Sequence, residues 1–115
     1  MLLLSVLSAG PANGYAIISS LRDRSEGMFD LPEGTIYPAL HRLEDAGLLI
    51  SSWAETDGRR RRVYGLTDRG AAALAAEQTE WRRFAGGMHA VLGWPAEAVW
   101  PKVMRRAPAA MGWSA

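Results

Sequence analysis

A chain of 115 residues, 49% hydrophobic and 22% charged, is expected to fold as one domain around a modest core. It contains no cysteine, which excludes disulfides and thiolate metal sites and is compatible with a reducing cytoplasm. The formal net charge of +1 indicates no particular partner, and no apolar run approaches the roughly 18 residues that span a membrane.

The first two predicted elements are helices. Residues 1–9 are apolar and predict a core helix of about two turns; a signal peptide is not expected, since no basic residue precedes the run. A Gly-Pro pair then ends this helix. Residues 15–24 follow the turn signal Asn13-Gly14, and apolar residues three and four apart predict a second helix with one buried face. Gly27 can terminate it.

A third helix is predicted from about Pro32 to Gly47. Proline and the acidic Glu33 suit a first helical turn. Pro38 conflicts with this helix because it lacks a backbone donor and disfavours helical geometry at the preceding residue. We expect a kink or a tight first turn there. The predicted buried stripe consists of Ile36, Leu40, Leu43 and Ala46 or Gly47.

The next segment changes to a pattern typical of a β-hairpin. Residues 48–54 and 62–66 have strand-like compositions, and residues 55–58 form a turn whose Asp-Gly pair is a strong hairpin signal. Four consecutive arginines, residues 59–62, are expected at the tip beside this turn. Arginine suits bidentate contact with phosphates and base edges better than lysine does.

The longest predicted element is a fourth helix from about Asp68 to about Leu92, with Thr67 as its N-cap. At about 25 residues it would be roughly 37 Å long, more than so small a domain covers, so its apolar seam needs a partner. The tail from residue 93 is interrupted by prolines, and a short helix is expected at about 96–106. The seam alternates by four and three, as in coiled coils, and consists of Leu74, Gln78, Trp81, Ala85, Met88 and Leu92.

Three helices, a hairpin and a long helix predict a mainly α fold with a small β-hairpin (α+β), a winged helix-turn-helix followed by a long dimerisation helix. Residues 1–66 would form the DNA-binding domain, residues 67–92 the dimerisation helix, and residues 93–115 a C-terminal tail of unknown role. The third helix can enter the major groove. The arginine-rich wing can reach a phosphate or the minor groove, where neutralised phosphates release counterions.

Several segments also form a specific pattern: Gly14-Tyr15-Ala16-Ile17, residues 34–44 beginning Gly-Thr-Ile-Tyr-Pro, Gly47-Leu48-Leu49, the wing residues 58–67, and Gly70. In this order and spacing they resemble the PadR family of transcriptional regulators, over roughly residues 2–92. That family keeps Tyr-Pro within its recognition helix, which resolves the conflict at the proline. The resemblance implies a homodimer that binds a roughly two-fold operator, usually as a repressor, and often an effector that releases the DNA.

Candidate DNA contacts lie on the second and third helices and the wing. Thr35 and Tyr37 can donate hydroxyl groups to phosphates, and His41 and Arg42 can reach base edges or backbone. The alternative roles are a half-buried helix side chain for Tyr37, an ordinary exposed side chain for His41 and a solvated turn for the arginine run. For Tyr15, phosphate contact and core packing have equal weight. The predicted set is Tyr15, Thr35, Tyr37, Pro38, His41, Arg42, Arg59, Arg60, Arg61 and Arg62.

Trp81 lies mid-seam on the fourth helix, where packing in a dimer interface is the favoured role. The alternative, suggested by the family resemblance, is an aromatic wall that stacks a flat hydrophobic effector between subunits, with Phe84, Met88 and Trp94 beside it. His89 is expected at the surface or interface. The predicted effector or dimer interface consists of Leu74, Gln78, Trp81, Phe84, Ala85, Met88 and Leu92.

No enzymatic site, metal site or cofactor is expected, since the sequence has no cysteine nucleophile, glycine-rich phosphate loop or metal-ligand spacing. A rival from another class is a winged-helix protein-interaction module without DNA binding, against which the arginine wing argues. A MarR-like winged helix is a rival within the same class, and it would carry helices on both sides of the winged unit. The expected partners are double-stranded DNA, a second copy of the chain and a small hydrophobic or aromatic effector, with no membrane.

Overall fold

The computed structural model describes residues 1–93, which form four helices and a three-stranded antiparallel sheet of order β1-β3-β2. This confirms the predicted α+β winged helix-turn-helix with a long C-terminal helix. The helix expected at about 96–106 lies outside the described residues. In chain order the elements are α1 (Leu2–Leu7), β1 (Ala12–Asn13), α2 (Gly14–Arg24), α3 (Glu33–Asp45), β2 (Leu49–Thr56), β3 (Arg59–Leu66) and α4 (Asp68–Leu92).

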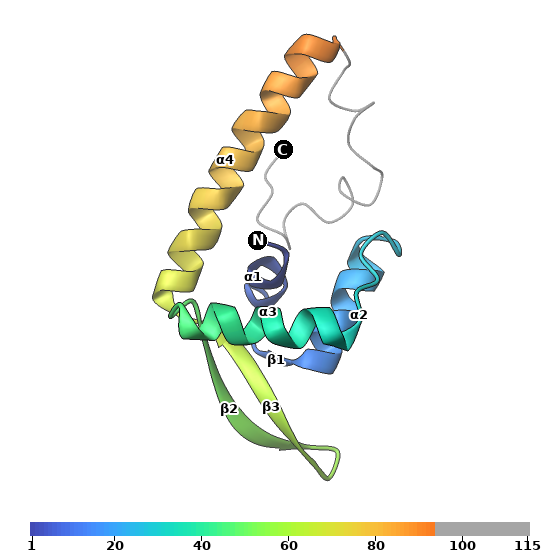
Figure 1. Cartoon of the computed structure of the whole chain (residues 1–115), viewed down its shortest axis with the longest axis vertical. Coiled ribbons are helices and arrows are strands. Elements are labelled where there is room, and N and C mark those ends of the chain that lie inside the picture. The colour runs from blue at the N-terminus through green and yellow to red at the C-terminus, as the bar shows by residue number, and fades with distance from the viewer. Residues whose placement is uncertain (94–115) are drawn as a thin grey trace.

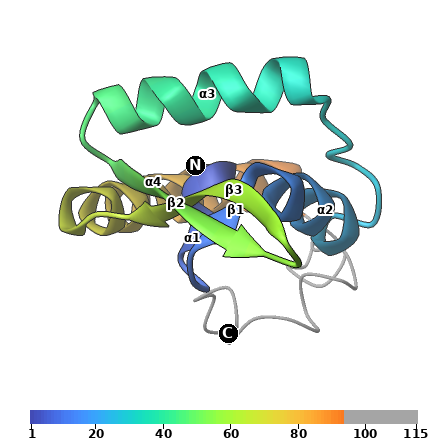
Figure 2. The same cartoon turned by 90° about the horizontal axis from the view of Figure 1, so that it is seen from below.

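The first three helices and the root of the sheet form a compact body from which two projections extend (Figure 1). The β2–β3 hairpin, called the wing below, leaves at one end, and α4 extends past α1 toward the other. Seen from below, α3 runs along one edge of the molecule, and the sheet and the other helices all lie to one side of it (Figure 2). The helix expected to read DNA and the wing therefore border one surface.

α2 begins earlier than predicted, at Gly14. The Asn13 side chain accepts a hydrogen bond of 2.9 Å from the Ala16 amide, so the Asn-Gly pair caps a helix. Ala12 and Asn13 also pair with Tyr64 and Val63 of β3. This two-residue strand was not predicted, because its ladder depends on a strand some fifty residues later in the chain and leaves no local periodicity.

α3 runs without a break through Pro38. Its first turn is tight, since the Pro32 carbonyl accepts hydrogen bonds from both the Thr35 and Ile36 amides, at 3.0 and 3.1 Å. Pro38 removes only the bond to the Gly34 carbonyl. Gly34 is exposed, so water can replace that bond at little cost.

Both strands of the wing are longer than predicted, and a two-residue turn joins them. Asp57 and Gly58 have φ of 55° and 73°, the left-handed geometry that suits a tight hairpin. All four arginines belong to β3, where Arg59 pairs with Thr56 and Arg62 with Trp53. Arg59 follows the turn directly, so the arginines begin beside the turn as expected, but β3 includes all four and carries them inward along the outer half of the hairpin. They run along a two-stranded ladder whose faces are open enough to accept charged side chains.

The core lies where the first three helices meet the sheet. The predicted stripe of the third helix is confirmed at Ile36 and Leu40, which are fully buried, and Leu43 is partly buried. The largest fully buried side chains are Tyr64, Leu4, Ile17, Ile36 and Leu40.

The base of α4 is fastened to this body. Thr67 is its N-cap as predicted, since Oγ1 accepts from the Gly70 amide at 3.0 Å and donates to the Gly47 carbonyl at 2.7 Å. A Cβ on Gly70 would lie 2.0 Å from the Leu48 carbonyl oxygen, so only glycine permits this approach. Leu74, one turn further, is 6% exposed and belongs to the domain's own core. The prediction that Leu74 belongs to an exposed seam is therefore wrong.

Among the described helices, none is both long and apolar enough to cross a membrane.

Candidate nucleic-acid interface

α3 presents an exposed stripe to solvent on the side away from the core. Thr35, Pro38 and Arg42 follow one another at spacings of three and four, and His41 lies beside them. All four are exposed, as predicted. An α-helix fits the major groove, so this stripe has the form needed to meet base edges.

Tyr37 points toward α2 instead. It is partly buried against the core, and a Cβ on Gly14 would lie 2.5 Å from its hydroxyl oxygen. The glycine therefore makes room for the tyrosine ring at the start of α2. This packing matches the alternative of a half-buried helix tyrosine, and it brings the hydroxyl to the first turn of α2.

Tyr15, in that same turn, is 63% exposed, so the core-packing alternative for it is wrong. The Arg61 guanidinium carbon lies 5.9 Å from the centroid of its ring, a cation–π arrangement. This contact joins the outer half of β3 to α2. It also brings a hydroxyl group and a guanidinium onto one surface.

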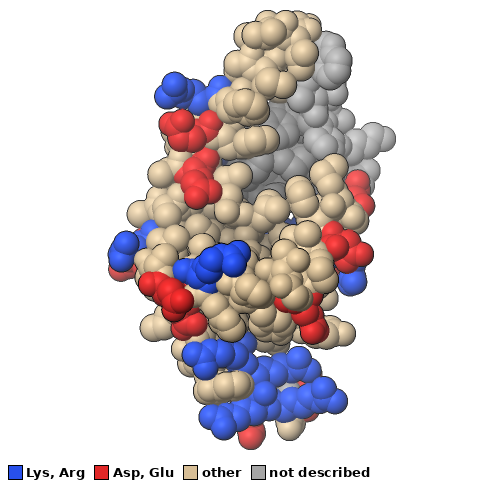
Figure 3. Space-filling view, in the orientation of Figure 1, with Lys and Arg blue, Asp and Glu red and all other residues tan. Residues whose placement is uncertain are grey.

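The arginines of the wing divide between two faces because side chains alternate along a strand. Arg60 and Arg62 share a face with Trp53, and their guanidinium carbons lie 4.9 and 5.3 Å from the centroid of the indole. Arg61 belongs to the opposite face. In the space-filling view the basic side chains gather over the wing, whereas acidic side chains are scattered over the body (Figure 3).

Arg62 is held at the root of the wing. Its Nε donates to Ser51 Oγ at 2.9 Å, and Ser51 in turn donates to a carboxylate oxygen of Glu44 on α3. Arg62 Nη2 lies 4.0 Å from the same oxygen. Burial raises the pKa of the neighbouring Tyr64, and the charge of Arg62 opposes that rise. Sequence reasoning missed Glu44 and Ser51; the only signal was that Glu44 closes the segment that begins Gly-Thr-Ile-Tyr-Pro.

The second half of α4 carries exposed apolar side chains, in contrast to its base. Of the predicted seam, Gln78 and Ala85 are partly buried. Val91, 87% exposed and seven residues after Phe84, was not predicted although its spacing places both on one side. Trp94 lies outside the described residues. The exposed members of this surface, called the α4 patch below, are Trp81, Phe84, Met88, Val91 and Leu92.

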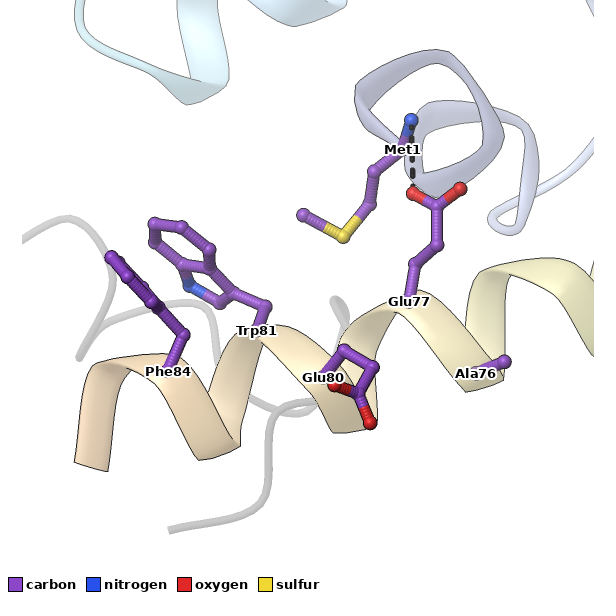
Figure 4. A pocket seen from close by; sticks show the side chains of 6 residues that line it. All are labelled: Met1, Ala76, Glu77, Glu80, Trp81 and Phe84. Atoms are coloured by element: carbon purple, nitrogen blue, oxygen red, sulfur yellow. Dashed lines mark ion pairs between the residues drawn. The ribbon is translucent and has the colours of Figure 1, made fainter. Parts of the chain in front are cut away.

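A shallow open hollow lies between the start of α1 and the α4 patch (Figure 4). The rings of Trp81 and Phe84 lie side by side along it, with centroids 5.6 Å apart. Met1 faces them, and its amino group is 3.5 Å from a carboxylate oxygen of Glu77. Within residues 1–93, no three His, Asp or Glu side chains are grouped so as to hold a metal ion.

The sequence pattern of the transcriptional regulator PadR-like family matches residues 3–76. The chain belongs to the PadR-like family. Over 45 residues it is 56% identical to Transcriptional regulator Rv3488 of Mycobacterium tuberculosis, a match that covers 39% of this chain and 42% of that protein. The chain thus spans under half the length of this relative.

Solved structures of the family share the fold. A PadR family transcription regulator from Clostridium difficile is 35% identical with a TM-score of 0.72, over 79% of this chain and 94% of that one. Bacillus subtilis PadR, solved in complex with operator DNA, is 26% identical with a TM-score of 0.62, over 67% of this chain and 44% of that one.

The PadR-like match covers the winged body, the wing and the base of α4. It ends at residue 76, before the α4 patch begins at Trp81. The Gly-Thr-Ile-Tyr-Pro segment lies at the start of α3, where the tyrosine closes on α2 and the proline is exposed. The matched region thus contains both the α3 stripe and all four wing arginines.

Proposed function

We propose that the protein is a homodimeric, sequence-specific DNA-binding repressor that acts in the cytoplasm and binds a roughly two-fold operator. The observation that carries this proposal is the exposed stripe of α3 beside an arginine-rich wing. The operator complex of Bacillus subtilis PadR supports the same use of this fold here. Residues 1–66 serve as the DNA-binding domain and residues 67–92 as the dimerisation helix, with residues 93–115 as a tail of unassigned role.

The α3 stripe enters the major groove and the wing meets the flanking backbone. Arg59, Arg60 and Arg61 neutralise phosphates, and the hydroxyl groups of Tyr15 and Tyr37 lie where the first turn of α2 approaches the backbone. Arg62 lies at the inner end of this surface. The groove-facing side chains are Thr35, Pro38, His41 and Arg42.

A second copy of the chain covers the α4 patch. Large apolar side chains exposed in one contiguous patch are typical of a protein interface. Trp81 and Met88 form the centre of the contact, with Gln78, Ala85 and Leu92 along the same seam.

The hollow beside Trp81 and Phe84 takes a small hydrophobic or aromatic effector when two copies meet. Paired aromatic rings with one open side can stack a flat apolar molecule. Because the same side chains serve the dimer contact, an effector bound there changes the relative orientation of the α3 helices of the two subunits. The dimer then no longer fits the operator and releases it.

The test is selection of bound duplexes from a random pool at physiological salt, together with light scattering of the free protein. The expected result is a dimer that enriches a two-fold site with half-sites about one helical turn apart. Arg42→Ala should relax base preference within each half-site, whereas Arg22→Ala, an equal charge change on α2, should leave the selected sequence unchanged. A monomer, or a pool without enrichment, would contradict the proposal, and the latter would favour a protein-interaction module.

A further inference from the structure

We propose that Glu44, Ser51 and Arg62 form a polar bridge that fixes the wing against α3, with Arg62 a positioning residue instead of a phosphate contact. The proposal rests on the DNA-binding function proposed above, since the surface that the bridge organises is the one that would meet DNA. It assigns Glu44, an acidic residue on the recognition helix, a role in binding a polyanion.

The bridge takes one residue from each of three elements. Ser51 of β2 uses its hydroxyl group twice, accepting from Arg62 Nε of β3 and donating to the Glu44 carboxylate of α3. The second contact of Arg62, through Nη2, reaches the same carboxylate oxygen. The side chains of Glu44 and Arg62 are only 27% and 40% exposed. They are therefore shielded from solvent more than an ordinary surface pair, which contributes little.

The wing needs such a fixture because its outer half is a two-stranded ladder. β1 pairs only with Val63 and Tyr64, so the arginines lie beyond the third strand. A two-stranded hairpin is marginally stable by itself. The bridge closes where the hairpin still lies against α3. From there Trp53, which pairs across the ladder with Arg62, carries the contact outward to the guanidinium of Arg60.

Arg62 is poorly placed for a phosphate. Among the four wing arginines, all within the described residues, only Arg62 has a carboxylate oxygen within 4.0 Å. Its Nε is occupied by Ser51, and the negative charge of Glu44 offsets its own. Arg59 and Arg60 are exposed, and no ion pair within the described residues joins Arg60 to Glu55, which lies opposite it across the ladder. The bridge thus separates one arginine that aims the wing from three that can meet the backbone.

The test compares Glu44→Ala with Asp45→Ala on a labelled random-sequence duplex. Both substitutions remove one negative charge from the end of α3, so electrostatics alone would tighten DNA binding in both. With the bridge, Glu44→Ala weakens binding about three- to tenfold, whereas Asp45→Ala leaves it unchanged or tighter. Tighter binding by both variants would overturn the proposal. If Glu44→Ala fails to fold, Glu44→Gln, which keeps an acceptor for Ser51, should weaken binding less but in the same direction.

A double-variant cycle separates positioning from direct contact. If Arg62 acts through the bridge, the double variant Glu44→Ala with Arg62→Ala binds DNA no more weakly than whichever single variant has the lower affinity. The salt slope of Arg62→Ala then equals that of the wild type. If Arg62 contacts a phosphate, the losses multiply and the slope falls by about one, which would overturn the proposal.

A wild-type protein that binds no duplex at any salt would contradict the proposed function and not the bridge. The bridge is then tested in the free protein by amide hydrogen exchange along β2 and β3. Faster exchange in Glu44→Ala than in Asp45→Ala supports it, and equal exchange overturns it.

Discussion

The two projections of this molecule differ in kind. The wing extends four arginines from β3, and the far half of α4 extends an apolar patch centred on Trp81 and Phe84. Both start from the same body, and within the described residues neither is covered by it. One surface carries charge suited to a polyanion, and the other carries apolar area suited to another apolar surface.

This difference predicts opposite responses to salt. Contacts between arginines and phosphates weaken steeply as salt rises, because the release of counterions from the DNA becomes less favourable at higher salt concentration. Burial of apolar area on α4 is insensitive to moderate salt and is strengthened by excluded salts such as sulfate. Under the proposed function, DNA binding and dimerisation should therefore separate experimentally.

The joint between the projections is where a single change should have the largest effect. Gly70→Ala would drive a Cβ into the Leu48 carbonyl, at the point where the wing begins and α4 is fastened. We expect the free energy of unfolding to fall by about 3 kcal/mol or more. Gly86→Ala, in the same helix with nothing within 4 Å of the new Cβ, should instead gain up to about 1 kcal/mol. Urea unfolding measures the stability of both variants. Equal midpoints would mean that the contact between Gly70 and the Leu48 carbonyl is not tight.

Dimerisation should respond next. Trp81→Ala removes the largest side chain of the α4 patch, and we expect the dimer dissociation constant to rise by about 30-fold or more. Thr79→Ala lies two residues away, on the opposite side of the helix, and should leave the constant unchanged. Sedimentation at several concentrations measures the constant. A Trp81→Ala dimer as tight as wild type would place the interface elsewhere.

The wing should show a smaller loss with a distinct signature. Replacing Arg60 and Arg61 together by alanine should weaken binding to every duplex about tenfold and reduce the salt slope by about two. Dimerisation should not change. Arg22→Ala with Arg24→Ala, an equal change of charge on α2, serves as the control. An unchanged slope in the wing variant would remove these two arginines from the contact.

The sequence predicted the two projections to different degrees. α4 was predicted at its observed bounds, because Thr67 is a strong N-cap and the apolar spacing is regular. The turn at Asp57-Gly58 was also predicted, since few residue pairs adopt two left-handed conformations in succession. The returning strand was predicted to begin at Arg62 and instead begins at Arg59, because a run of identical charged residues shows no alternation that would mark a strand.

Contacts between distant segments were beyond local patterns. Periodicity marked Leu74 as part of the seam but could not tell that the first turns of α4 face their own domain. The bridge from Glu44 through Ser51 to Arg62 spans three elements, and no spacing along the chain encodes it. The exposed stripe of α3 was predicted correctly because a helix period fixes its two faces at once.

The smallest expected effect concerns pH, at the root of the wing. Burial raises the pKa of Tyr64 above its usual value of 10.0, so the fold favours the neutral hydroxyl group. The resulting stability is fully present below about pH 10 and is lost as pH rises through the folded pKa.

Tyr64→Phe cannot ionise, so its urea midpoint should fall less than that of wild type between about pH 8 and about pH 11. Tyr15→Phe removes an exposed hydroxyl group and should keep the wild-type dependence. Equal slopes in all three proteins would mean that the tyrosine ionises as easily in the fold as in the unfolded chain. The wing root would then open to water independently of the body.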